Sequence, residues 1–185
     1  SNNSSEKISS QTKQILKKYQ DREKTDGKNN LIWDEIIPSG EGYWVGKNPY
    51  SPTAGEWTRW ILDNNHNFET PAPPILNSVQ DKKEIEIVIN AVKSRDDKEW
   101  LPKIEFWAGG PGTEAPSGIW LNRLYEETKN QKINDMQYAR YQKILTQTIA
   151  DAFMECWKVK FTYWTARPSM RMKQLSITQS NPNFP

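Results

Sequence analysis

The residues best suited to chemistry are cations near the end of the sequence. Five of them stand between Cys156 and Pro185, with no acidic residue among them. They are Lys158, Lys160, Arg167, Arg171 and Lys173. A basic stretch of this kind beside aromatic residues is suited to binding an anion, although most charge runs are only the solvated face of a helix.

Two of these cations, Lys160 and Arg167, are spaced to act together. They are seven residues apart, and two turns of an α-helix would return them to nearly one face, about 10 Å apart along the axis. A lysine supplies a compact charge and an arginine a planar pair of donors, so together they suit one tetrahedral oxyanion. Because the C-terminal end of a helix is the negative end of its dipole, the side chains must attract the anion there.

The remaining reactive residue types give weak signals. The one histidine, His66, lies in an asparagine-rich turn with no Cys, Asp or Glu at metal-ligand spacing. The one cysteine, Cys156, falls in an apolar helical run, which predicts a buried and inert thiol. The glycine-rich run 109–113 has neither the lysine nor the preceding strand of a phosphate-binding loop, so it predicts a tight turn.

The segment 160–168, KFTYWTARP, resembles the first signature, KxxxxxxRP, of the type 2 phosphatidic acid phosphatase and vanadium haloperoxidase superfamily. Further segments are similar to its bacterial haloperoxidase-related branch. They are 40–44, 106–113, 150–153, 156–157 and 163–164.

That resemblance implies roles for three residues. Lys160 and Arg167 would bind the oxygens of phosphate or vanadate. Trp157 would line the halide side of the pocket, with simple packing in the core as the alternative. Vanadate would be the cofactor of a haloperoxidase, which oxidises halide with peroxide, whereas a phosphatase would need no cofactor and would hydrolyse a small phosphate ester. The sequence does not separate these two activities.

The other two signatures of the superfamily are absent. PSGH supplies backbone and hydroxyl donors with an acid–base histidine, and SRxxxxxHxxxD supplies the nucleophilic or vanadate-linking histidine. With His66 alone, the two-histidine mechanism cannot be assembled from these residues. We therefore expect the N-terminal part of a larger enzyme, whose partner is the missing C-terminal half, and we expect this part alone to be inactive and to bind anions weakly.

Helical periodicity predicts the elements that position the cations. The predicted helices are 6–24, 78–94, 97–108, 117–129 and 134 to about 166. Ser78, with Asp81 three residues later, is typical of a helix N-cap. Residues 31–74, here called the arm, are rich in Gly, Pro and aromatic residues, and predict an irregular segment that wraps the helices.

We therefore expect an all-α fold, a helical bundle of the phosphatase and haloperoxidase type with the arm laid on it. We expect residues 1–5 to form a flexible leader. We expect residues 6–185 to form a single helical domain that is incomplete at its C-terminal end. Hydrophobic residues make up only 35% of the chain, partly offset by nine Trp. Apolar surface should be exposed on the long helix where the missing half docks, which favours self-association.

Charge and hydropathy limit the other classes. A net charge of +2 gives no support for nucleic acid as a partner. No run of 18 apolar residues predicts a membrane span. The small polar start and the resemblance favour export, to the periplasm or to a lipid anchor at the cell envelope.

Two other hypotheses stay open. In the first, the chain is a non-catalytic helical binding or interaction module, and Lys160 and Arg167 are only surface cations. In the second, the basic and aromatic tail binds nucleic acid, which predicts a steep loss of affinity with salt. The modest net charge makes the second the weakest hypothesis.

Overall fold

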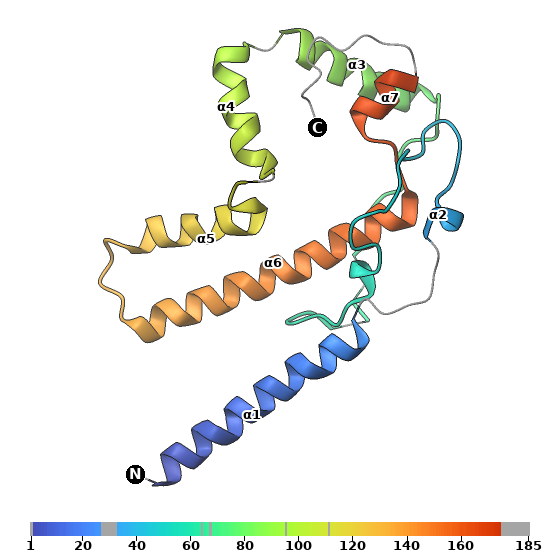
Figure 1. Cartoon of the computed structure of the whole chain (residues 1–185). Helices are drawn as coiled ribbons and strands as arrows, with labels where there is room; N and C mark the ends of the chain where they lie inside the picture. Colours follow the sequence, from blue (N-terminus) through green and yellow to red (C-terminus); the bar gives the residue numbers. More distant parts are fainter. Residues whose placement is uncertain are drawn as a thin grey trace.

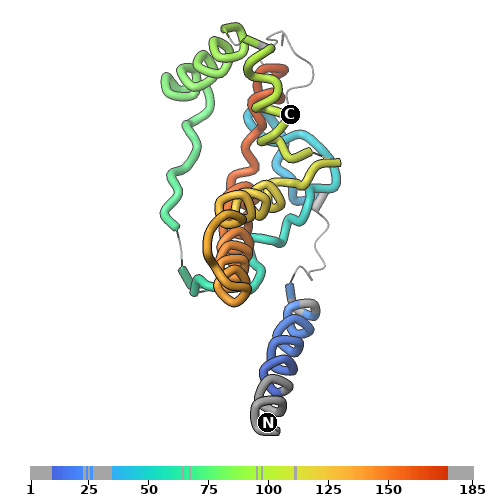
Figure 2. Tube along the Cα trace, turned by 90° about the vertical axis from the view of Figure 1, so that its left-hand side faces the viewer, coloured from blue at the N-terminus to red at the C-terminus, as the bar shows by residue number. Residues whose placement is uncertain are grey.

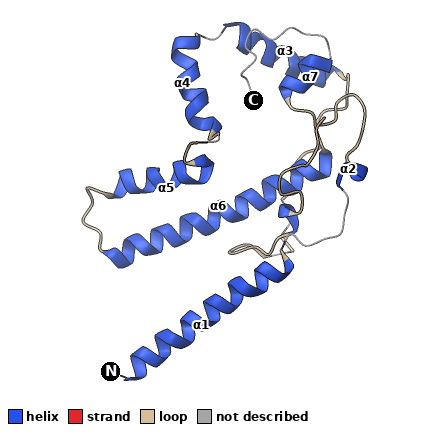
Figure 3. Cartoon of the chain, viewed as in Figure 1, coloured by secondary structure: helices blue, strands red, loops and turns tan. Residues whose placement is uncertain are grey.

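The computed structural model describes residues 2–26, 33–63, 65–66, 68–94, 96–110 and 112–174. Within these ranges the regular structure is helical and no β-strand is formed (Figure 3). The all-α class predicted from the sequence is therefore confirmed.

The helices follow one another along the whole described chain (Figure 1). They are α1 (Asn2–Thr25), α2 (Trp33–Ile36), the 3-10 helix η1 (Ala54–Glu56), α3 (Val79–Ser94), α4 (Asp97–Ala108), α5 (Ala115–Thr128), α6 (Asp135–Tyr163) and α7 (Pro168–Gln174). Helices α3, α4 and α5 begin and end within two residues of their predicted bounds. α1 begins at Asn2, so residues 2–5, expected as a leader, are helical. The short helices α2, η1 and α7 were not predicted.

Local hydrogen bonds explain where several helices begin and end. The Ser78 hydroxyl accepts the N–H of Asp81 at 3.2 Å, which confirms the predicted N-cap of α3. Before α6, the Asn134 side chain accepts the N–H of Gln137, and the Gln137 side chain accepts the N–H of Asn134, both at 2.9 Å. This reciprocal capping box satisfies two donors that the helix itself leaves free. α4 ends at Gly109, whose φ of 54° is left-handed.

The helices are arranged in an open ring rather than a closed bundle. In Figure 1, α3, α4, α5 and α6 follow one another around this ring, and α7 returns to pack on α3. α1 points away from the other helices in both views (Figures 1 and 2) and packs on none of those described. The solvent-accessible surface is 14430 Å², well above the roughly 9,200 Å² expected for a compact monomer of this mass. Much of the chain is thus uncovered.

The tightest packing joins the arm to α6. Ala54 of η1 is fully buried, and Met154 of α6 is 3% exposed. Gly55 makes this approach possible, because a Cβ added there would lie 2.5 Å from the Cα of Lys158. Arm and helix are therefore in backbone contact within a few residues of Lys160.

Aromatic side chains of the arm pack against α1, α6 and the residue that follows α6. The ring centroids of Trp57 and Phe153 are 6.2 Å apart, and those of Trp60 and Tyr19 are 5.3 Å apart. Trp44 lies 6.1 Å from Trp164, just beyond the end of α6. Trp33 is another aromatic residue of the arm, and its side chain is outside the described side chains.

The apolar stripe of α6 is less buried than its spacing predicts. Cys156, expected to be buried, is exposed, and Tyr141 and Ile144 are 42% and 49% exposed. The reason is that α6 packs only on η1 and α5 among the described elements, so part of its surface has no neighbour.

Taken over the described residues, no helix combines the length and the apolarity needed to cross a membrane.

Candidate anion-binding site

The helix that carries Lys160 ends earlier than predicted. α6 ends at Tyr163, and Trp164 takes the left-handed conformation with φ 51° and ψ 31°. The N–H of Trp164 donates to the carbonyl of Lys160 at 2.9 Å, which closes the last turn. Arg167 therefore lies beyond the helix, and the prediction that it shares a helical face with Lys160 is wrong.

The segment after α6 is held by the arm. The N–H of Trp44 donates to the Trp164 carbonyl at 2.7 Å, and the N–H of Ala166 donates to the Gly42 carbonyl at 2.8 Å. Between these bonds Tyr43 and Thr165 form an isolated antiparallel bridge. These bonds hold residues 164–166 in a non-helical conformation, so Arg167 lies beside the arm and not on the helix.

Lys160, Arg167 and Trp157 nevertheless line one cleft, of about 1230 Å³. The C-terminal half of α6, the segment that follows it and the arm all contribute to its walls. The cleft has an aromatic lining: Trp44, Tyr50, Phe68, Phe161, Tyr163 and Trp164. Its acidic lining residues are Glu69, Asp151 and Glu155. All three residues singled out in the sequence are thus brought to one place, by a turn and not by a continuous helix.

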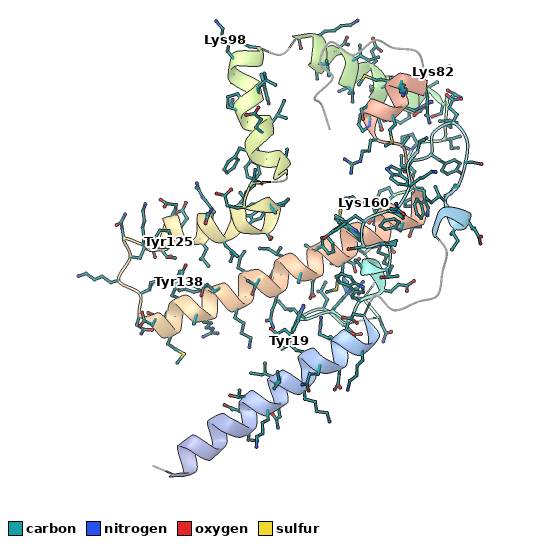
Figure 4. The ribbon with its side chains drawn as sticks, in the orientation of Figure 1. Tyr19, Lys82, Lys98, Tyr125, Tyr138 and Lys160 are labelled. Carbon is teal, nitrogen blue, oxygen red and sulfur yellow. The ribbon has the colours of Figure 1, made fainter. Side chains whose placement is uncertain are left out.

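The Trp157 side chain contacts three other residues. Its ring stacks on Phe153 with centroids 3.9 Å apart, and its Nε1–H donates to the Tyr50 carbonyl at 2.9 Å. The ammonium of Lys160 lies over the same ring, 3.7 Å from the centroid. Trp157 therefore both lines the cleft and packs against its neighbours, and it holds the charge of Lys160 by a cation–π contact. Lys160 lies near the C-terminal end of α6 (Figure 4).

The five cations of the basic stretch differ in their partners. Within the described residues, neither Lys160 nor Arg167 forms an ion pair with a carboxylate, and both are exposed. Arg171, by contrast, is 7% exposed and pairs with Glu41 and Asp81. Burial lowers the pKa of Arg171, but its bonds to the two carboxylates outweigh burial and raise that pKa above its usual value. Arg171 is therefore not available to an external anion, unlike the exposed Lys160 and Arg167.

Asp151 is a buried carboxylate of the cleft that sequence reasoning missed. Its oxygens accept the N–H groups of Trp60 at 2.7 Å, Ile61 at 2.8 Å and Leu62 at 3.0 Å. Burial acts to raise the pKa of Asp151, but these donors and the charge of Arg22 hold the pKa below its usual value. The side chain stays ionised and fixes the arm against α6. The signal for it was an acidic residue between two alanines inside an apolar stripe.

No described residue of the cleft supplies an imidazole. His66 is exposed, is not among the cleft residues, and contacts Phe68 edge-on with centroids 4.4 Å apart. In the part of the chain that the structure covers, no group of three His, Cys, Asp or Glu is placed to hold a metal ion. Two cations fit the oxygens of phosphate or vanadate, but the described residues do not fit the bond from an imidazole to vanadium.

Comparisons with known proteins gave no match, since no protein family, no curated protein and no solved structure was found to be similar to this chain.

Proposed function

We propose that the cleft at the end of α6 binds a tetrahedral oxyanion through Lys160 and Arg167. On this proposal the chain is the N-terminal part of an acid-phosphatase-like or vanadium-haloperoxidase-like enzyme. The observation that carries it is a contrast within one basic stretch. Lys160 and Arg167 line the cleft without a carboxylate partner among the described residues, whereas Arg171 is buried between two carboxylates.

The two side chains would divide the work of holding the anion. The guanidinium of Arg167 would donate two parallel hydrogen bonds, and the ammonium of Lys160 would supply a compact charge. Aromatic side chains form part of the walls, and their low polarity would strengthen both interactions. The same pair would stabilise the charge that builds up on phosphate oxygens during transfer.

The chain alone would bind anions weakly. Glu69 lines the same cleft and opposes a negative ligand, whereas Glu155 of the cleft forms an ion pair with Arg59. No imidazole among the described cleft residues is available to attack phosphorus or to bond vanadium. The reacting group and the remaining donors would come from the C-terminal half of the enzyme, with phosphate ester, or halide and peroxide, as substrates.

Titration with inorganic phosphate, followed by heteronuclear NMR, tests the proposal. We expect Lys160→Ala and Arg167→Ala each to weaken binding by about tenfold, the effect of losing one charge-assisted contact. Lys173→Ala is the matched control, since Lys173 is exposed and belongs to the same stretch but does not line the cleft. Equal affinity in all three variants would show that Lys160 and Arg167 are only surface cations.

A second candidate function is a non-catalytic interaction module, favoured by exposed aromatic residues on α4 and α5. Phe106, Trp107 and Trp120 are 56%, 59% and 48% exposed, and their rings contact one another in series. A cluster of this kind is typical of a surface that another protein covers. Sedimentation equilibrium tests self-association through it. The module is supported if the chain self-associates and Trp107→Ser reduces that association, and a monomer at all concentrations argues against a second copy as the partner.

A further inference from the structure

Arg171 is a cation of the basic stretch that anion binding does not explain. We infer that Arg171 is a positioning residue, which holds Arg167 in the wall of the cleft. This inference rests on the proposed function, because it concerns the same anion site. It follows from the way three distant segments of the chain meet at one guanidinium.

The guanidinium of Arg171 joins α7 to two other elements. Its Nη1 forms an ion pair with Glu41 of the arm. Its Nη2 lies 2.9 Å from an oxygen of Asp81, in the first turn of α3, and 3.2 Å from the Asn77 side-chain oxygen. With 7% of its surface exposed, Arg171 is enclosed by these partners and is not available to an anion in the cleft.

Arg167 lies between two anchored points. On its N-terminal side, the N–H of Ala166 donates to the Gly42 carbonyl at 2.8 Å. On its C-terminal side, the N–H of Arg171 donates to the Arg167 carbonyl at 2.9 Å in the first turn of α7. The N–H of Gly42 in turn donates to the Gln174 side chain at 3.1 Å.

These bonds form a closed path from the arm to α7 and back. Gly42 bonds to both flanks of the Arg167 segment, and Glu41, its neighbour, bonds to the Arg171 side chain. If the pairing of Arg171 is lost, α7 keeps the Gln174 bonds to the arm, but the C-terminal anchor of Arg167 is held less firmly. The Arg167 side chain would then sample more positions, and each bound anion would have to order it again.

Lysine cannot replace Arg171 in this arrangement. Its single ammonium carries the same charge but lacks the fork that reaches two carboxylates from different directions. Arg171→Lys therefore removes the geometry and keeps the charge. We expect it to weaken phosphate binding by about three- to tenfold, in the range of coupling between residues that act through shared contacts.

A double-mutant cycle separates positioning from general stability. Phosphate binding is titrated for the full chain in the wild type, R171K, R167A, R171K/R167A and R171K/K160A. If Arg171 acts through Arg167, R171K causes no further loss once Arg167 is absent, but keeps its effect in the K160A background. If R171K weakens binding equally in both backgrounds, its role is only structural, and the inference is overturned.

Glu41→Gln is the milder variant that keeps the test decisive if R171K does not fold. The Glu41 side chain is 43% exposed, so its loss spares the buried part of the cluster. Helix content by circular dichroism confirms that each variant is folded. If R167A weakens binding while R171K and E41Q bind as the wild type does, the inference fails and the proposed function stands. If R167A itself has no effect, the proposed function fails.

Discussion

The ammonium of Lys160 lies 3.7 Å from the centroid of the Trp157 ring, and the same indole donates to the Tyr50 carbonyl at 2.9 Å. The contact holds the lysine charge against a residue of the cleft that Arg167 also lines. A ring fixed in this way reduces the freedom that Lys160 must lose when it binds an anion.

Replacing the Trp157 ring should therefore weaken phosphate binding. An exposed cation–π contact contributes about 0.5–1 kcal/mol, so Trp157→Leu should cost about two- to fivefold in affinity. Trp157→Phe keeps an aromatic face and should lose less, although the bond to Tyr50 is absent. NMR titration with phosphate measures both variants, and equal affinities for Leu and Phe would rule out a contribution from the ring face.

The buried carboxylate of Asp151 should matter for stability and for its dependence on pH. Asp151→Asn leaves part of a three-donor site without an acceptor, which should lower the free energy of unfolding by about 1–3 kcal/mol. Because the pKa of Asp151 is lower in the folded chain than in the unfolded chain, its contribution is present above the unfolded pKa of about 3.9 and is lost as the pH falls below that value.

Urea unfolding at stepwise lower pH checks this sign. The wild type should lose stability more steeply than Asp151→Asn as the solution is acidified, and the two should converge at the acid end. Some dependence on pH should remain in the variant, because the pKa of Asp81 is also lowered. Parallel curves for the two proteins would show that the carboxylate is not held in its ionised form.

The approach of η1 to α6 should not tolerate a side chain at Gly55. In Gly55→Ala the added Cβ would meet the backbone of Lys158 at 2.5 Å, so the two elements must separate. We expect a loss of about 1–3 kcal/mol in the free energy of unfolding. Gly110→Ala is the control, since nothing lies within 4 Å of its added Cβ. Equal stability of the two variants would argue against the close approach.

Two substitutions at Trp164, whose backbone is left-handed, separate the cost of backbone strain from the loss of side-chain burial. Both Trp164→Ala and Trp164→Gly lose the packing of a side chain that is 7% exposed, but only alanine keeps the strain of a φ of 51°. The glycine variant should therefore be the more stable of the two, by about 1 kcal/mol. Thermal unfolding distinguishes them, and a more stable alanine variant would show that the turn is not maintained.

The sequence predicted those features that depend on local interactions. α3, α4 and α5 were found because apolar spacing and turn residues act within a few positions, and the cap at Ser78 is formed with Asp81 three residues away. Lys160 and Arg167 were chosen from residue types and spacing, and Trp157 from the resemblance to the phosphatase and haloperoxidase superfamily. The structure places all three at one cleft.

Features that depend on distant partners were missed. α6 ends at Tyr163 because the arm, more than a hundred residues earlier, pairs with the backbone at Trp164 and Ala166. Asp151 meets N–H donors about 90 residues away, and Glu41 lies 130 residues from Arg171. Helical periodicity contains no information on such pairs, so the buried Arg171 was grouped with the exposed Lys160 and Arg167.

The most direct test of the account observes the two side chains while the anion binds. In the wild type, the guanidinium N–H resonance of Arg167 and the side-chain resonances of Lys160 are followed during titration with inorganic phosphate. The account predicts that both shift with the same midpoint, because one oxyanion contacts both residues. Shifts with different midpoints, or none at either residue while distant signals move, would contradict a shared oxyanion site.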